Sequence, residues 1–214
     1  MAGATTAARR RRCTLTMPRL LILFAHPRLE KSRANRALLA QLPTHKDITF
    51  RDLYELYPDF NVDIVAEQAL MAAHDIVVLH HPFYWYSMPP LLKQYIDLVY
   101  AFGWAYGPDG RALQGKAQFH VLTTGGAKEA YTPEGFHGNT LAAFMLPLKR
   151  TATLCGMTWL PPYTVHGTNR LTDAELDQAA RHYRDLLLAL AEGRMDPRTL
   201  TALDRLDQIA LPTH

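Results

Sequence analysis

Three stretches of the chain are continuously apolar over the length of a β-strand. They run from Arg19 to Ala25, from Asp75 to His80 and from Ala117 to Thr123. A short run without apolar–polar alternation is typical of a strand buried on both faces, as in a parallel sheet. Two less regular runs, Ile48 to Leu53 and Met157 to His166, bring the strand candidates to five.

Helical patterns separate these strand candidates. They cover Ser32 to Gln41, Asp63 to Ala73, Pro90 to Phe102, Leu141 to Cys155 and Leu171 to Glu192. Strands that alternate with helices predict βαβ units. We therefore expect an α/β, doubly wound fold with a five-stranded parallel sheet and helices on both faces. Pro161-Pro162 interrupts the last strand candidate, which places that strand at the edge of the sheet.

Open sheets of this kind bind ligands beyond the carboxyl ends of their strands, at the point where the strand order reverses. Three loops follow strand candidates at that end, and they begin at His26, His81 and Thr124. We expect these loops to form one site.

The first loop leads into a helix at Ser32, a good N-cap residue. The first N–H groups of that helix suit a phosphate. The chain has neither the Gly-x-Gly-x-x-Gly nor the Gly-x-x-x-x-Gly-Lys-Ser/Thr pattern, which argues against a Rossmann-type dinucleotide site and against a nucleoside triphosphatase. A mononucleotide such as FMN fits. His26 is either part of this site or a histidine that caps a strand.

The second loop holds four consecutive aromatic residues, Phe83, Tyr84, Trp85 and Tyr86, between two proline-containing turns. Such a cluster is either core or a wall for a flat ligand. Its place among turn residues at the ligand-binding edge favours the wall.

The third loop contains Thr123-Thr124-Gly125-Gly126, followed by Tyr131 and His137. Glycines let backbone N–H groups approach a flat ring closely, and a phenol and an imidazole can hydrogen-bond the oxygens of a substrate. The alternative is a glycine turn beside ordinary surface residues.

Together these segments resemble the flavodoxin-like NAD(P)H:quinone oxidoreductases, and most of all the ancillary oxidoreductases of glutathione-gated potassium-efflux (Kef) systems. The resemblance runs from about Arg19 to about Glu192. Its most specific pieces are Ala25 to Pro27, Leu53 to Asn61, Trp85 to Lys93, Gly103 to Gly107, Thr123 to Gly126 and Cys155 to Pro162.

The resemblance implies a bound FMN and NAD(P)H as co-substrate. FMN contacts would come from His26, Ser32, Arg33, Ala34 and Asn35 at the phosphate and ribityl end, from Phe83, Tyr84, Trp85 and Tyr86 along the ring, and from Thr123, Thr124, Gly125 and Gly126 at the pyrimidine side. Tyr131 and His137 would be the catalytic residues that face nicotinamide and quinone. The implied reaction is a ping-pong, two-electron transfer of hydride from NAD(P)H to a quinone.

The resemblance also implies a homodimer, with Trp104 and Tyr106 as candidate interface residues. It further suggests a membrane potassium-efflux transporter as partner, and an alternative function as a regulatory subunit with secondary redox activity. An electron-transfer flavodoxin is disfavoured because such proteins are typically strongly acidic.

The net charge of +3 comes from four arginines at positions 9–12, since the remaining 19 basic residues face 20 acidic ones. The body therefore shows no nucleic-acid face. His80 and His81 are adjacent and point to opposite faces of a strand, and no zinc-type spacing is present, so we expect no metal site.

Length suits one domain, expected over residues 19–193. Residues 1–18 form a basic extension expected to be disordered, and residues 194–214 form a tail. In that tail Leu200, Leu203 and Leu206 have helical spacing, which predicts a short helix docked on the body or on a partner.

No apolar run approaches the ~18 residues of a membrane span, and the N-terminus lacks the apolar core of a secretory signal. Two cysteines also suit a reducing compartment. A cytoplasmic protein is expected, at the cytoplasmic face of the inner membrane if it binds a transporter.

Overall fold

The computed structural model describes residues 17–211. Its centre is one parallel sheet with strand order β2-β1-β3-β4-β5, and β6 also pairs with β4. The strands are β1 (Leu20–Phe24), β2 (Ile48–Asp52), β3 (Ile76–Pro82), β4 (Ala117–Thr123), β5 (Thr158–Trp159) and β6 (Tyr163–Val165). This order is that of the doubly wound flavodoxin-like sheet, as the sequence pattern predicts.

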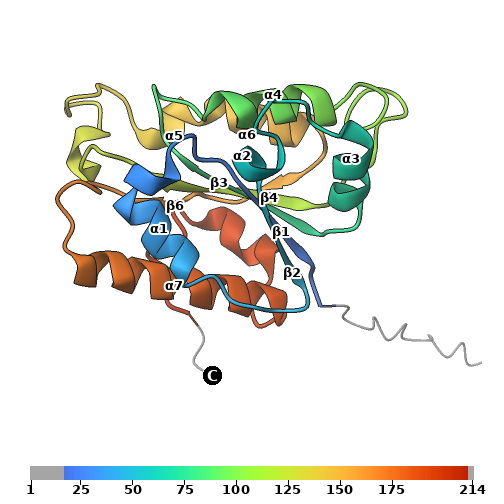
Figure 1. Ribbon diagram of the computed structural model, residues 1–214. Helices are drawn as coiled ribbons and strands as arrows, with labels where there is room; N and C mark the ends of the chain where they lie inside the picture. The colour runs from blue at the N-terminus through green and yellow to red at the C-terminus, as the bar shows by residue number, and fades with distance from the viewer. Residues whose placement is uncertain (1–16, 212–214) are drawn as a thin grey trace, which may run out of the picture.

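Helices cover both faces of the sheet, with α1 and α7 below it and α2, α3, α4 and α6 above it in Figure 1. The helices are α1 (Arg33–Ala40), α2 (Leu53–Leu56), α3 (Ile64–Ala72), α4 (Pro90–Val99), α5 (Leu141–Phe144), α6 (Leu146–Leu154) and α7 (Asp173–Ala191), with 3₁₀ turns η1 (Leu29–Lys31), η2 (Lys128–Ala130) and η3 (Pro197–Ala202). None of the described helices is long and apolar enough to cross a membrane.

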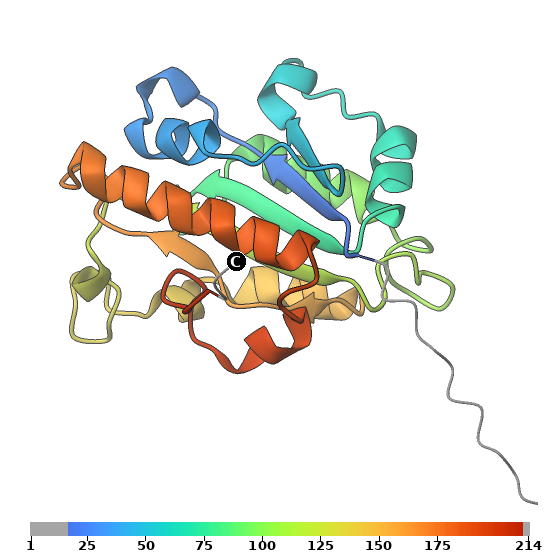
Figure 2. The same cartoon turned by 90° about the horizontal axis from the view of Figure 1, so that it is seen from below.

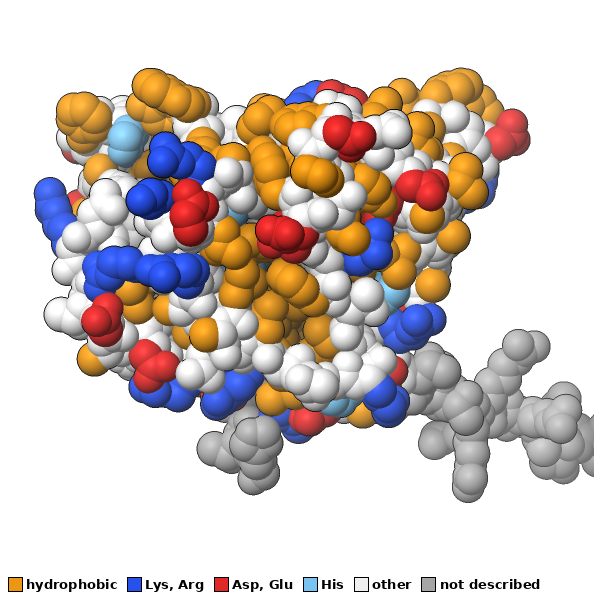
Figure 3. Space-filling view, viewed as in Figure 1, with side chains coloured by type: hydrophobic (Ala, Val, Ile, Leu, Met, Phe, Trp, Pro, Cys, Tyr) orange, Lys and Arg blue, Asp and Glu red, His pale blue; other side chains and the backbone are white. Residues whose placement is uncertain are grey.

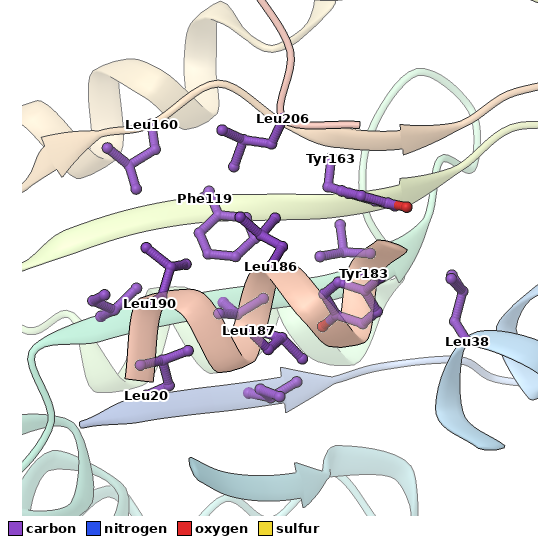
Figure 4. Close-up of a cluster of buried hydrophobic side chains, with 14 of the residues drawn as sticks. Leu20, Leu38, Phe119, Leu160, Tyr163, Tyr183, Leu186, Leu187, Leu190 and Leu206 are labelled. Atoms are coloured by element: carbon purple, nitrogen blue, oxygen red, sulfur yellow. The ribbon is translucent and has the colours of Figure 1, made fainter. Parts of the chain in front are cut away.

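Two hydrophobic cores explain why the central strands lack alternation. Leu20 and Ile22 of β1 pack with α1 and α7 in one core, whereas Leu21 and Leu23 pack with α3 and α4 in the other. Successive side chains of a strand point to opposite faces, so a strand covered on both sides must be apolar throughout. Figure 2 views the sheet from the α7 side, and Figure 4 shows the first core, where Leu186, Leu187 and Leu190 of α7 lie against the sheet.

The predicted fifth strand is broken into two short strands, so the sheet has six rather than five. β5 pairs with the start of β4 at Ala117, and β6 pairs with its end at Val121 to Thr123. Pro161 and Pro162 lie between them and have no N–H to donate to a ladder, which accounts for the break.

The predicted helix from Leu141 to Cys155 is likewise two helices, α5 and α6, which meet at Met145. Pro147 lies in the first turn of α6. A continuous helix would need an N–H from this residue, so the sequence stops one helix and starts another.

The tail after Gly193 docks on the body of the protein. Leu200 and Leu206 are buried in the first core, whereas Leu203 is 39% exposed, so only part of the predicted leucine stripe packs inward. The Leu206 N–H donates to the Pro162 carbonyl (3.0 Å), and an Asp207 oxygen accepts the Thr164 N–H (3.2 Å). The tail therefore covers the outer edge of β6. Of the extension predicted to be disordered, residues 1–16 lie outside the described residues.

We expect Leu206→Ala to lower the free energy of unfolding by about 2 kcal/mol, because it removes a fully buried side chain and leaves a cavity. Leu203→Ala, three residues away and exposed, should change it by less than about 0.5 kcal/mol. Urea denaturation of both variants is the measurement. Equal effects would mean that the tail does not pack against the body in solution.

Candidate functional site

A cavity of about 520 Å³ lies at the carboxyl edge of the sheet, within the size range of small-molecule sites. It is lined by His26, Arg28, Lys31, Ser32, Arg33, Ala34, Asn35, Pro82, Phe83, Tyr84, Thr123, Gly125, Thr168 and Asn169. The three loops expected to meet do meet here. This edge is at the left of Figure 1, and Figure 3 shows hydrophobic side chains at its upper part with Lys and Arg side chains below them.

The N-terminus of α1 supplies anion-binding groups to the cavity. Ser32 is the N-cap, and its hydroxyl oxygen accepts the Asn35 N–H (3.2 Å). Within residues 17–211 the N–H groups of Arg33 and Ala34 have no acceptor. Two free N–H groups at the positive end of a helix suit a phosphate. The cations Arg28 and Lys31 line the same end and favour such a charge further.

Asn35, almost fully buried, fixes this helix start to the sheet. Its amide nitrogen donates to the hydroxyls of Ser32 (2.9 Å) and Thr123 (3.0 Å), and its oxygen accepts from Nε2 of His80 (3.1 Å). The amide group therefore joins α1, β3 and β4. Burial lowers the pKa of His80 to about 3, so the imidazole is neutral and carries its proton on Nε2.

His26 is a buried residue that lines the cavity. Its Nδ1 accepts the Arg28 N–H (3.0 Å), so the neutral ring carries its proton on Nε2, which lies 3.4 Å from the Tyr84 hydroxyl. Burial lowers the pKa of His26, an effect partly opposed by the charge of Glu30. His26 is therefore a neutral hydrogen-bonding group.

The aromatic loop closes in a tight turn. The Ser87 N–H donates to the Tyr84 carbonyl (2.9 Å), and Trp85 and Tyr86 have φ values of 49° and 62°. Two non-glycine residues in the left-handed region are costly and are found mainly at functional sites. Trp85 is 93% exposed, whereas Phe83 packs against Tyr131 in a small core. The four aromatics therefore do not form one flat wall.

Tyr131 and His137 lie together on the far side of the glycine pair. Their ring centroids are 4.4 Å apart, and the Tyr86 hydroxyl is 3.3 Å from Nδ1 of His137. A Cβ on Gly126 would lie 3.1 Å from both rings, so only glycine fits comfortably. Burial raises the pKa of Tyr131, which keeps its phenol protonated as a donor.

The buried Thr124 contributes support. Its hydroxyl donates to the Gly126 carbonyl (2.8 Å) and therefore accepts from Nδ1 of His166 (3.0 Å). Backbone bonds from Gly167 to Gly126 and from Thr168 to Thr124 hold the same loop. The residues that follow β6 thus hold the glycine turn in place by hydrogen bonds.

The sequence-predicted site residues fall into two groups. Most line the cavity, whereas Trp85, Tyr86, Thr124, Gly126, Tyr131 and His137 lie beside it. Sequence reasoning missed Arg28 and Lys31, which flank the helix start as cations. It also missed Thr168 and Asn169, although a loop after the last strand at the same edge was a usable signal.

The described residues hold no cluster of three or more His, Cys, Asp or Glu side chains that could bind a metal. The groups that this site offers are the anion-binding N-terminus of α1, an aromatic rim, and a phenol and an imidazole beside a glycine turn.

Comparisons with known proteins identify the family of this fold. The flavodoxin-like fold family matches residues 18–187. The glutathione-regulated potassium-efflux system ancillary protein KefF of Klebsiella pneumoniae (strain 342) is 45% identical over 177 residues, which are 83% of this chain and 99% of that protein.

Three solved structures are similar. General stress protein 14 of Treponema denticola, in complex with FMN, is 36% identical with a TM-score of 0.77 and covers 81% of this chain and 99% of its own. A thermophilic tryptophan halogenase from Streptomycin violaceusniger is 40% identical with a TM-score of 0.76, and the match covers 78% of this chain and 98% of the halogenase chain. An NADPH-quinone reductase from P. pentosaceus is 30% identical with a TM-score of 0.69, and the match covers 78% of this chain and 97% of the reductase chain.

Proposed function

The chain belongs to the flavodoxin-like fold family, and from this premise we propose that it is an FMN-dependent NAD(P)H:quinone oxidoreductase. The observation that carries the proposal is the start of α1, where two free N–H groups and flanking cations line a cavity at the reversal of strand order. Further support comes from the similar structures, one of which is described with FMN and another as an NADPH-quinone reductase.

The residues present fit FMN. The N–H groups of Arg33 and Ala34, with Ser32 and Asn35, would hold its phosphate and ribityl chain. Phe83 to Tyr86 would border its ring, and Thr123 to Gly126 its pyrimidine side, where backbone N–H groups stabilise negative charge. When bound, FMN would supply two-electron hydride chemistry between NAD(P)H and a quinone.

Tyr131 and His137 would act on the substrate. Both lie beside Gly126 and both can donate a hydrogen bond to a quinone oxygen on which negative charge develops. Tyr86, whose hydroxyl is 3.3 Å from Nδ1 of His137, would hold the imidazole in place.

The first test is the absorbance spectrum of the purified protein, which should show bands near ~370 and ~450 nm from a bound flavin cofactor. Oxidation of NADPH or NADH should then depend on an added quinone. A colourless protein that binds no FMN would refute the proposal. Halogenation of tryptophan without quinone turnover would instead favour the activity named for the similar halogenase structure.

We expect Ser32→Glu to weaken FMN binding by at least about tenfold, or ~1.4 kcal/mol, because the new carboxylate repels the phosphate and covers its N–H donors. Ser32→Ala is the matched control, since it loses the helix cap without adding charge. Fluorescence titration of the flavin-free proteins gives both affinities. Equal affinities for the two variants would place the phosphate elsewhere.

We also propose a homodimer that uses the loop from Phe102 to Tyr106. Phe102 is 70% exposed, whereas Trp104 and Tyr106 are half-buried against the core. Aromatic residues are enriched at protein interfaces. The roles of Trp104 and Tyr106 in completing a partner's site remain predictions.

Light scattering at micromolar concentration should give the mass of a dimer, and Phe102→Asp should shift it toward the monomer. Val65→Asp is the control, because Val65 is 78% exposed on helix α3 and lies outside this loop. A monomeric wild-type protein with full activity would exclude the dimer.

A second candidate function is that of a regulatory subunit of a potassium-efflux transporter. The observation that favours it is 45% identity to a potassium-efflux ancillary protein over 99% of that protein's length. Co-purification with such a membrane transporter would support it. If the purified protein turns over quinones but neither binds nor activates the transporter, the reductase would be the only one of the two functions that is supported.

A further inference from the structure

A second cavity, of about 390 Å³, lies between η2, β6, α7 and the tail. Its apolar walls include Val165, Leu171 and Ala179, and its charged lining includes Lys128 and Arg205. Arg205 comes from the tail, beyond residue 187, where the family match ends. Arg205 and Asp207 thus lie outside the family match, whereas the rest of the lining lies within it.

The two carboxylates of the lining are already occupied. Asp207 accepts the Thr164 N–H with one oxygen, and its other oxygen is 3.0 Å from a guanidinium nitrogen of Arg205. Glu175 accepts from the N–H and the hydroxyl of Thr172 in a capping box at the start of α7. Glu175 uses only Oε2 for these bonds, and its charge is offset by the N-terminus of α7 and not by a cation.

The two cations, in contrast, have donors to spare. The ammonium group of Lys128 has no acceptor among residues 17–211. Arg205, whose side chain is only 16% exposed, has a guanidinium nitrogen 3.0 Å from Asp207, and no other acceptor for its five N–H donors is found in that range. Both cations lie near enough to His166 to disfavour its protonation, beyond the effect of burial. Spare cationic donors in a cavity of this size fit an oxyanion.

We propose that this second cavity binds the phosphate or carboxylate group of a small organic molecule and that the tail completes it by supplying Arg205. Asp207 positions the guanidinium, and the apolar wall accommodates the body of the ligand. Arginine and lysine are the side chains best suited to such oxyanions.

The cavity adjoins the proposed substrate face. His166 lines it and also donates to the Thr124 hydroxyl, while the rings of His166 and Tyr131 are 5.5 Å apart. The anion can therefore come from two sources. One, which rests on the proposed function, is the 2′-phosphate of NADPH reaching over His166; the other is a separate metabolite.

Calorimetry on the purified full-length protein tests the site directly, with adenosine 2′,5′-bisphosphate, 5′-AMP and citrate as probes. Wild-type protein should bind the bisphosphate or citrate, and Lys128→Gln and Arg205→Gln should each weaken that binding about tenfold or more. Arg198→Gln, which removes a charge from the same tail outside the cavity, should bind as wild type does.

The sources are then separated by kinetics. A bisphosphate that binds more tightly than 5′-AMP, with a KM for NADPH but not for NADH raised in both cavity variants, indicates the 2′-phosphate. Binding of citrate with equal effects on NADPH and NADH indicates a separate anion. Because Lys128 makes no contact that holds the tail, Lys128→Gln stays informative if Arg205→Gln does not fold. Wild-type protein that binds neither probe, or a Lys128→Gln variant that binds both normally, would overturn the proposal whether or not the protein is a reductase.

Discussion

Replacing Tyr131 by Phe or His137 by Gln is expected to leave FMN bound and to lower quinone turnover by roughly 10–1000-fold. The two side chains lie beside Gly126 and outside the cavity that would hold the flavin phosphate. Each would donate a hydrogen bond that strengthens as charge develops on the quinone. Stopped-flow measurement of the two half-reactions in flavin-loaded variants shows which hydride transfer slows.

Tyr183→Phe is the matched control, because it removes a buried phenolic hydroxyl that has no hydrogen-bond partner among the described residues and lies in the first core. Its turnover should equal that of the wild type. If Tyr131 and His137 are structural residues, their variants will lose flavin or stability instead. Normal rates of both half-reactions in flavin-loaded variants would show that the catalytic assignment is wrong.

The fold was predictable because the three central strands are short, largely apolar runs that alternate with longer helical patterns. Leu20 to Phe24 are all fully buried, since α1 and α7 cover one side of β1 and α3 and α4 the other. Only a strand between two layers of helices needs such a run. Periodicity could not show where Pro161-Pro162 and Pro147 divide an element in two, because the apolar pattern continues across those positions.

The site was predictable in outline because the ends of parallel strands converge. His26, Phe83 and Gly125 follow three different strands yet line one cavity. Sequence reasoning assigned Asn35 a ligand contact, and the structure gives its side chain hydrogen bonds to Ser32, Thr123 and His80. Such a role depends on partners 45 and 88 residues away, which no local pattern reveals. Whether these residues hold FMN stays a prediction.

A second buried network, on the opposite face of β3, has one consistent assignment of protons. The Tyr100 hydroxyl donates to Oε1 of Gln118 (2.9 Å), whose amide nitrogen faces Nε2 of His120 (3.3 Å). Nδ1 of His120 faces Nε2 of His81 (2.9 Å), and Nδ1 of His81 faces the Pro82 carbonyl (3.0 Å). A carbonyl only accepts, so each imidazole carries one proton, on Nδ1. A proton added to Nε2 of either ring would meet another N–H.

Burial, reinforced by this geometry, keeps both imidazoles neutral. The pKa of His81 is lowered to about 4 and that of His120 well below its ordinary value, and the pKa of His80 on the other face is about 3. In the unfolded chain each ring takes up a proton near the ordinary histidine pKa of 6.5. Unfolding therefore takes up protons below that pH. The contribution of these histidines to the free energy of unfolding is therefore fully present above about pH 6.5. It falls as the pH drops toward their pKa values in the folded state.

We expect the free energy of unfolding to fall by roughly 4 kcal/mol per pH unit between about pH 6 and pH 5 from these three histidines alone, at ~1.4 kcal/mol for each. His120→Gln should remove one third of that slope, because an amide can donate to His81 and accept from Gln118 without titrating. Tyr100→Phe is the control, since it breaks the far end of the network and should lower stability while the slope stays at the wild-type value. Urea denaturation at several pH values gives all three slopes.

Burial raises the carboxyl pKa values of Asp52 and Asp207, so these groups change the free energy of unfolding with pH in the opposite sense. Their effect is the same in each protein and cancels when the slopes are compared. A His120→Gln slope equal to that of wild type would mean that His120 is not kept neutral by the fold.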